Sequence, residues 1–207
     1  MVKTVSGVDG YITKPDGTNN KKVFSLPLSQ VLISWPSQNL LLAQTKSMES
    51  VPGIAFSIDA KSGTVTALLY ANGITAKADA AFSHIIYQTD ASGALTTYSH
   101  DVKKNNDVRL LFDPAPEQCI WSAIATSTMY CANPVSYVEP GYLDLWHLGA
   151  AAAADGIFRY NVISGSHSSV ALPQQVNVLE MSLSPNEKYL SFTTKGARSL
   201  WAVRLTQ

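Results

Sequence analysis

Short runs of alternating apolar and polar residues cover most of the chain, and clusters of Gly, Pro, Asn and Asp separate them. This period-2 pattern is typical of half-buried β-strands. Four runs resemble one another: NLLLAQT (39–45), FSHIIYQT (82–89), TMYCAN (128–133) and KYLSFTT (188–194). The centres of the first three lie about 43 residues apart, and the fourth follows about 62 residues later. The pattern therefore predicts an internal repeat.

A second pair of strands follows each of the first three runs. The turns of these pairs are DAKSG (59–63), KKNND (103–107) and ISGS (163–166). Such turns between alternating segments indicate hairpins. Each repeat then holds four antiparallel strands, which matches a β-propeller blade in length and strand number. A β-sandwich is the alternative, but repetition at this spacing favours an all-β propeller.

We treat 1–207 as a single propeller domain. Its predicted blade parts are 8–27, 28–71, 72–112, 113–172 with an insertion at 134–155, and 173–207. The first part reads as the last two strands of a blade, and the last part as the first three. The N-terminal pair could complete the last blade and close a ring of about four blades. Alternatively, the chain is the C-terminal part of a larger propeller and has exposed strand edges.

The segment GYLDLWHLGAAAAADG (141–156) explains why the last repeat comes late. It is predicted to lie between strands two and three of the third blade. Alanine favours helices, but 145–155 is shorter than the 12–15 residues that an isolated helix needs. We expect one or two helical turns from about Asp144 to Leu148, followed by an extended stretch. This flap either covers the top of the channel or shapes a pocket there.

The last repeat carries a family resemblance. Its turn, Ser184-Pro185-Asn186-Glu187-Lys188, and its pair Leu200-Trp201 resemble the Ser-Pro-Asp-Gly-Lys turn and the Leu-Trp pair of TolB-like and WD-like bacterial propellers. Trp35-Pro36-Ser37-Gln38-Asn39 is a weaker copy of the same turn. A second resemblance, to secreted or membrane-anchored propellers of uncultured bacteria whose function is not settled, is carried by GYITKPDGTNNKKVFSLPL (10–28), VPGIAFSIDAKSGTVTALL (51–69), EQCIWS (117–122) and GYLDLW (141–146). The resemblance covers nearly the whole chain and implies a fold but no activity.

Composition narrows the function classes. Charged residues make up 14% of the chain and the formal net charge is zero, whereas soluble domains average about 25% charged residues. No basic run indicates nucleic-acid binding. No apolar stretch is long enough for a membrane-spanning helix. Trp35, Trp121 and Trp201 are expected to pack between blades.

The two cysteines, Cys119 and Cys131, flank a hairpin centred near residue 125, which places them opposite each other. Opposed residues of an antiparallel pair are close enough for a disulfide. We therefore predict a disulfide and an extracytoplasmic, bacterial location. Two reduced, buried cysteines are the alternative. The spacing offers no zinc site, and we expect no metal and no cofactor.

Loops that join strands two and three, and loops that join successive blades, gather on one face of a propeller. We assign to this loop face the segments 46–52, 72–79, 113–118, 134–155 and 172–177. Their carboxylates are Glu49, Asp79, Asp113, Glu117, Glu139, Asp144 and Asp155. Glu139, Asp144 and Glu117 are the candidate catalytic residues, and Trp146, His147, Tyr142 and Asp113 are the candidate ligand-binding residues. Alternatively, these acids only solvate loops or cap turns.

Two function classes follow. The first is a non-enzymatic extracytoplasmic module that recognises a protein or glycan through its loop face. The alternative is a propeller glycoside hydrolase, in which paired carboxylates stand within about 10 Å beside an aromatic platform. A homodimer through exposed blade edges is a further expectation. The hydrolase requires acids of the 113–117 and 139–155 loops to converge around a pocket.

Overall fold

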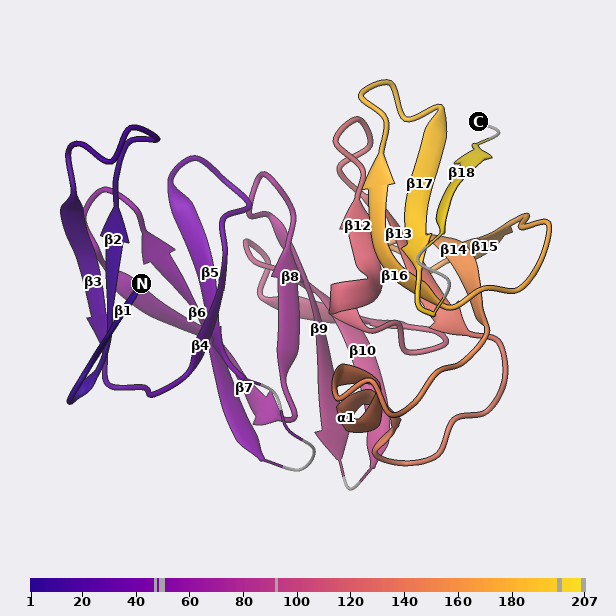
Figure 1. Ribbon diagram of the computed structural model, residues 1–207, viewed down its shortest axis with the longest axis horizontal. Coiled ribbons are helices and arrows are strands. Elements are labelled where there is room, and N and C mark those ends of the chain that lie inside the picture. The colour runs from indigo at the N-terminus through magenta and orange to yellow at the C-terminus, as the bar shows by residue number, and fades with distance from the viewer. Residues whose placement is uncertain (47, 49–50, 92, 197–198, 206–207) are drawn as a thin grey trace.

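The computed structural model describes residues 1–46, 48, 51–91, 93–196 and 199–205. It consists of five antiparallel sheets with a single short α-helix among the described residues (Figure 1). This architecture confirms the prediction of an all-β propeller and excludes a two-sheet sandwich.

The three central sheets have four strands each, in the order in which the strands follow along the chain. The first consists of β4 (Val31–Ser34), β5 (Leu40–Thr45), β6 (Pro52–Asp59) and β7 (Val65–Asn72). The second consists of β8 (Thr75–Ala78), β9 (His84–Ala91), β10 (Ala94–Asp101) and β11 (Asn106–Leu110). The third consists of β12 (Cys119–Trp121), β13 (Thr128–Pro134), β14 (Asp155–Asn161) and β15 (His167–Val170). This up-and-down order is that of propeller blades.

The two end sheets have three strands each. They consist of β1 (Val2–Thr4), β2 (Gly7–Ile12) and β3 (Lys21–Leu26), and of β16 (Val178–Leu183), β17 (Tyr189–Thr194) and β18 (Leu200–Arg204). The sequence predicted two strands in the first of these sheets, and β1 is the additional one. Its three residues are all exposed, so the sequence shows no alternation of buried and exposed positions that would predict this strand.

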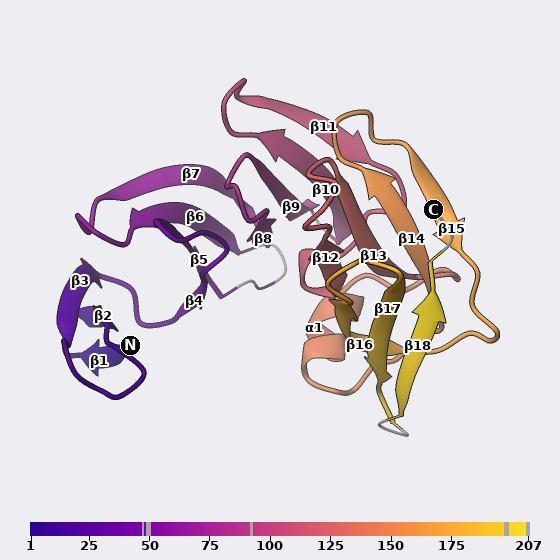
Figure 2. The same ribbon diagram turned by 90° about the horizontal axis from the view of Figure 1, so that it is seen from above.

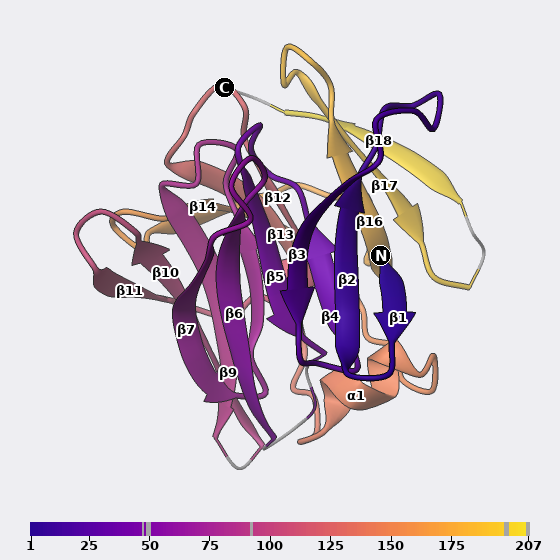
Figure 3. The ribbon, with the colours of Figure 1, turned by 90° about the vertical axis from the view of Figure 1, so that its left-hand side faces the viewer.

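The five sheets follow one another along an open arc (Figure 2). In the described part of the chain, the sheet β1–β3 does not hydrogen-bond to the sheet β16–β18. The closed-ring hypothesis required the N-terminal strands to complete the last blade, and in this structure they do not. Seen from the N-terminal side, β1–β3 stand in front of the other sheets, and the helix α1 lies below them (Figure 3).

The core lies between successive sheets rather than inside one of them. Four apolar clusters fill the four gaps along the arc. In the first gap, Phe24 and Leu26 of β3 pack against Leu41 and Ile58 of the next sheet. Each inner sheet thus buries both faces, which explains why strands such as β13 are buried along almost their whole length.

The hairpin that ends each complete blade repeats one local structure. The side chains of Asp59, Asp101 and Asn161 each accept hydrogen bonds from the backbone N–H groups two and three residues later. Four residues after each of these lies a Gly or Asn with φ between 53° and 77°. A left-handed residue at this place closes the turn, and Gly or Asn adopts it most easily. These turns lie where the sequence predicted them.

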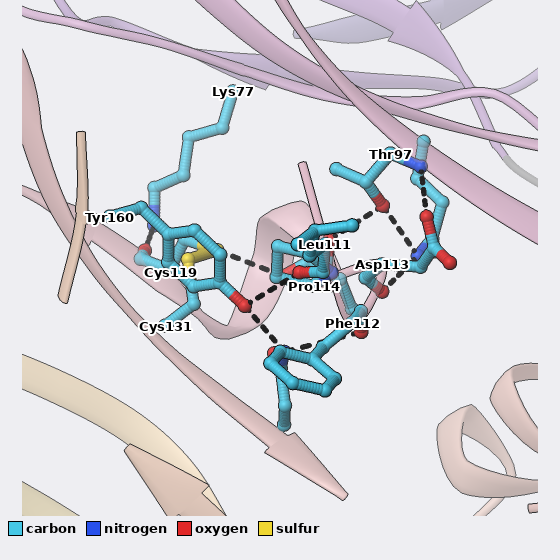
Figure 4. Close-up of a disulfide and its surroundings, with 12 residues drawn as sticks. Lys77, Thr97, Leu111, Phe112, Asp113, Pro114, Cys119, Cys131 and Tyr160 are labelled. Atoms are coloured by element: carbon cyan, nitrogen blue, oxygen red, sulfur yellow. Dashed lines mark hydrogen bonds between the residues drawn. A yellow bond between two sulfur atoms is a disulfide. The ribbon is translucent and has the colours of Figure 1, made fainter. Parts of the chain in front are cut away.

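Cys119 and Cys131 form a disulfide between directly paired residues of β12 and β13, as predicted (Figure 4). Both residues lie in the core between the second and third complete sheets. The prediction for the tryptophans holds in part. Trp121 and Trp201 pack against the apolar clusters in the third and fourth gaps between sheets. Trp35, which follows the short strand β4, is 54% exposed instead.

Candidate functional site

A pocket of about 370 Å³ lies on the loop face between the second complete sheet and the insertion. Three parts of the chain enclose it. The sheet contributes the start of β8 and the β9–β10 hairpin. The linker from β11 to β12 contributes a second wall, and residues 134–147 contribute the third. The insertion joins β13 to β14, the second and third strands of its sheet. The flap therefore shapes a pocket.

The helix of the insertion is α1 (Tyr142–His147). It begins two residues earlier than predicted, because Gly141 takes a left-handed conformation with φ 78° and turns the chain into the helix. The alanines do not continue it. Lys195 of the last sheet donates to the carbonyl oxygens of Trp146 and Ala151 at 3.2 and 2.7 Å. The N–H groups of Ala150 and Ala151 both donate back to Leu145 O, and with Gly149 at φ 78° the alanines form no regular secondary structure.

Two contacts fix α1 over the pocket. Tyr142 is buried beneath the helix. On the other side, Nε2 of His147 lies 3.0 Å from Oε1 of Glu117 in the short 3₁₀-helix η1 (Pro116–Gln118). The hydrogen bond to Glu117 raises the pKa of His147. The contact joins the flap to the linker, the two segments that the sequence placed on one face.

The linker that forms the second wall has a strained backbone. Phe112 and Asp113 are consecutive non-glycine residues with φ of 64° and 44°. Such conformations cost about 1–3 kcal/mol each and persist where the surrounding structure enforces them. Here the neighbouring side chains supply the constraint, and most of these contacts are visible in Figure 4.

Four successive linker carbonyl groups each accept a hydrogen bond from a side chain of a neighbouring strand. The donor–acceptor pairs are Tyr160 Oη to Leu111 O at 3.0 Å, Asn133 Nδ2 to Phe112 O at 3.2 Å, Gln88 Nε2 to Asp113 O at 2.9 Å and Thr97 Oγ1 to Pro114 O at 3.0 Å. All four donor residues are buried. Residues 111–114 of the linker are therefore each held by a side chain, and the Asp113 carboxylate is positioned at the pocket wall.

The charged side chains of the lining are almost all acidic. They are Asp90, Asp113, Glu139, Asp144 and His147. Within the described part of the chain, no Lys or Arg lines the pocket. Asp90 accepts a hydrogen bond from the Gly93 N–H at 2.7 Å. Asp113 accepts one from the Thr97 N–H at 2.9 Å and lies 3.5 Å from the exposed guanidinium of Arg109.

Thr75, at the start of β8, contributes a polar group with no partner. The residue is 3% exposed, and its Oγ1 makes no hydrogen bond to any described residue. Buried hydroxyl groups are normally satisfied, so an orphan at a pocket wall indicates a place for a polar ligand atom or a water molecule. Exposed aromatic side chains of Phe112 and Tyr137, 61% and 80% accessible, stand beside the same pocket.

A second polar cluster lies behind the flap, at Asp155. Its N–H donates to Val176 O at 2.7 Å, and its Oδ2 accepts from the Val178 N–H at 2.8 Å. Its other oxygen, Oδ1, has no partner among the described residues, and neither has Oδ1 of Asn177. Burial raises the pKa of Asp155 to about 6. Burial and, next, the charge of Asp155 raise the pKa of Tyr142 to about 12.

The structure brings most of the predicted site residues together. Those that line the pocket are Asp113, Glu139, Tyr142, Asp144 and His147. Glu117 lies outside the lining but contacts His147. Trp146 also lies outside it, and the Lys195 ammonium stands 5.3 Å from its ring centroid. The roles assigned to these residues remain predictions.

Three other acids assigned to the loop face lie elsewhere or cannot be placed. Asp79 follows β8, whose first residue is at the pocket, so it lies at the opposite end of that strand. There it accepts hydrogen bonds from Ser83. Asp155 is buried behind the flap. Glu49 lies outside the described residues.

Sequence reasoning missed the residues that the sheet contributes, above all Thr75, Gln88 and Asp90. They belong to strands, where polar residues in an alternating pattern normally face solvent. These positions become part of the pocket wall only because the linker and the insertion pack beside them. A weak signal existed in Gly73, whose φ is 57° and whose missing Cβ would lie 2.6 Å from Cβ of Asp90.

The described residues contain no group of three or more His, Cys, Asp and Glu side chains placed to hold a metal ion. None of their helices is long and apolar enough to cross a membrane.

Comparisons with known proteins identify the fold. No protein-family model matches the chain, and no curated protein matches it in sequence. Among solved structures, TolB from Acinetobacter baumannii matches with a TM-score of 0.63 and 12% identity over 96% of this chain and 49% of that one. A putative TolB from Agrobacterium tumefaciens gives 0.61 and 11% over 90% and 62%.

A third neighbour is the β-propeller domain of the Trilobed protease from Pyrococcus furiosus, with a TM-score of 0.56 and 11% identity over 96% of this chain and 62% of that one. The chain therefore spans about half to three-fifths of the length of these neighbours. The likenesses confirm the resemblance to TolB-like propellers at the level of fold. The chain has the fold of a partial β-propeller, similar to that of TolB.

Proposed function

We propose that the chain is an extracytoplasmic, bacterial propeller module that binds a protein or glycan ligand in the loop-face pocket. The observation that carries the proposal is the enforced linker beside the flap. A strained backbone whose successive carbonyl groups, at residues 111–114, are held by buried side chains is typical of sites that must keep a fixed shape. The pocket is also within the volume range of ligand sites, about 300–1,000 Å³.

The disulfide supports the extracytoplasmic part of the proposal. Disulfides persist in oxidising compartments and are rare in the cytosol. Cys119 and Cys131 are both buried, and no free cysteine remains among the described residues. A buried cross-link is the kind that stabilises a fold rather than one that cycles during catalysis.

The binding proposal can be tested with two probe sets, a phage-displayed random peptide library and an array of free glycans. A ligand found by either should fail to bind Leu95→Trp, which fills the pocket from its lining. The matched control is Val65→Trp, at an exposed position of β7. Circular dichroism and thermal unfolding establish that both variants are folded. Binding that survives Leu95→Trp undiminished would place the ligand elsewhere and refute the proposal.

A glycoside hydrolase is the second candidate function. The observation in its favour is that Asp113 from the linker and Glu139 and Asp144 from the insertion 134–155 line one pocket. Hydrolysis of a glycosidic bond requires two such carboxylates on either side of the sugar. A panel of chromogenic glycosides tests the hypothesis. Activity that Glu139→Gln and Asp144→Asn both abolish would support it, and a panel without any turnover would count against it.

Association of two copies is a separate proposal. Each end sheet has one strand fewer than the central sheets, so within the described residues β1 and β18 lie where a complete blade would have a further paired strand. Unpaired strand edges favour association through added β-pairing. Light scattering after size-exclusion chromatography would give the mass of the species, and a monomer at high protein concentration would contradict this proposal.

A further inference from the structure

The charge of the pocket indicates what kind of ligand it accepts. Four carboxylates and one imidazole line it, and the described lining contains no Lys or Arg. The nearest cations leave this imbalance in place. Arg109 reaches only Asp113 and is exposed. Lys195 points at carbonyl groups of the flap, and the charge of Lys46 acts on His147.

The carboxylates of the lining differ in the hydrogen bonds that they already accept from the protein. Asp90 and Asp113 each use an oxygen to accept a backbone N–H. Replacing either of these two residues would therefore remove a backbone contact as well as a charge. Glu139 precedes the turn into α1 and is exposed. It is the carboxylate whose removal changes the charge of the pocket with the least effect on the fold.

The walls between these charges are apolar. Leu95, Val138 and Pro140 line the same pocket. Apolar walls beside acidic groups suit a side chain with a methylene stem and a cationic head. The buried Oγ1 of Thr75, which lacks a partner, adds a neutral acceptor at the wall. An ammonium group carries three N–H donors and no acceptor, so it can use both kinds of oxygen.

We propose that the pocket binds a primary ammonium group on an aliphatic chain, in the form of a lysine side chain of a peptide or protein. This inference rests on the proposed binding function and specifies the ligand. An amino sugar also carries an ammonium group, but its ring is covered with hydroxyl groups that the apolar walls would leave without partners. A lysine side chain matches both the walls and the acidic groups.

The test compares two blocked peptides that differ in one group. Acetyl-Gly-Lys-Gly-amide carries the ammonium, and acetyl-Gly-norleucine-Gly-amide has the same stem without it. Titrations followed by NMR chemical shifts should show the lysine peptide binding about tenfold more tightly, because charge-assisted hydrogen bonds are lost in the other peptide. Added salt should weaken only the lysine peptide.

Variants locate the binding. Glu139→Gln should weaken the lysine peptide about threefold, which is typical of one half-exposed charge pair. Glu180→Gln, which removes the same charge from an exposed position of β16, should have no effect. The pocket-filling Leu95→Trp should abolish binding. If the lysine peptide binds all three variants equally, it binds outside the pocket, and the inference is wrong.

The remaining outcomes separate this inference from the binding function itself. Equal affinity of the lysine and norleucine peptides would overturn the ammonium proposal and leave a binding pocket of another specificity. Binding of glucosamine but not of the lysine peptide would overturn the choice of lysine. Failure of these probes and of every library peptide and array glycan would reject the binding function as well.

Discussion

Nε2 of His147 and Oε1 of Glu117 lie 3.0 Å apart and join the helix of the flap to the linker between two blades. The two residues are 30 positions apart in the sequence. Both side chains are about a third exposed. The contact closes one side of the pocket, so its strength should depend on the charge of the imidazole.

We predict that this contact is pH-dependent. The hydrogen bond to Glu117 is the main cause that raises the pKa of His147 above its usual value, and Asp144 adds to it while burial and Lys46 oppose it. A raised pKa in the folded state means that the stabilisation is complete below the unfolded pKa, about 6.5, and is lost as the pH rises through the folded pKa. His147→Gln should therefore reduce stability at pH 5.5 by about 0.2–1 kcal/mol and by less at pH 8.5.

Urea unfolding at the two pH values measures this difference. Glu117→Gln provides the matched variant, and the double variant should lose no more than either single one, because the two residues form one interaction. A loss that is the same at both pH values would show that the imidazole acts by packing and not by charge.

Asp155 differs from His147 in that its charged form should destabilise the fold. Burial raises its pKa to about 6, from an ordinary value of 3.8. The folded state thus binds the proton more tightly, and stability falls as the pH rises between these two values. Asp155→Asn keeps an oxygen for the Val178 N–H and has no charge to bury. We expect this variant to gain up to about 3 kcal/mol at pH 7.5, at 1.36 kcal/mol for each pKa unit, and nothing at pH 3.5.

The control for Asp155 is Asp16→Asn. Hydrogen bonds from Thr18 lower the pKa of the exposed Asp16, so its removal should be unfavourable at neutral pH. Urea unfolding curves of both variants and the parent at pH 3.5 and 7.5 give the comparison. A loss of stability in Asp155→Asn at pH 7.5 would show that the ionised carboxylate is well solvated in the fold.

The sequence was sufficient to predict strands and turns but only part of the pocket. Alternation and turn chemistry are local, so the hairpins at Asp59 and Asp101 could be placed before the structure was known. Sequence reasoning also placed Asp113 and Glu139 on one face, because both lie in connecting loops. It assigned Asp79 to the wrong face, since it ignored that β8 crosses the whole blade. Thr75 lies in the segment 72–79 that the sequence placed on the loop face, but its place in the pocket wall could not be predicted, because it depends on a neighbouring segment.

The disulfide should contribute strongly to stability. It joins residues 12 positions apart, and closing such a loop in the unfolded chain is worth about 3 kcal/mol by the entropic argument. Cys119→Ala/Cys131→Ala should lose about that amount in urea unfolding. Adding a reductant should destabilise the parent and leave this double variant unchanged. A parent that is insensitive to reductant under unfolding conditions would contradict the prediction.

Glu187 stands where the related turn pattern has glycine, and the structure supplies a reason. Its φ is 51°, a left-handed value that favours glycine. Its carboxylate, however, accepts hydrogen bonds from the Ser122 Oγ at 2.6 Å and from the N–H groups of Ala123 and Ile124 at 2.6 and 3.1 Å. The side chain thus joins the β12–β13 turn to the last sheet and offsets the strain of its own backbone.

Two substitutions at Glu187 separate these contributions. Glu187→Ala loses the three hydrogen bonds and keeps the backbone strain, so it should lose about 1–3 kcal/mol. Glu187→Gly loses the same bonds but relieves a left-handed conformation that costs an L-residue about 1–2 kcal/mol. Glycine should therefore be the more stable of the two variants, which thermal and urea unfolding would show. An alanine variant as stable as the parent would mean that the bonds to the β12–β13 turn contribute nothing. A glycine variant less stable than alanine would mean that the backbone at this position is not strained.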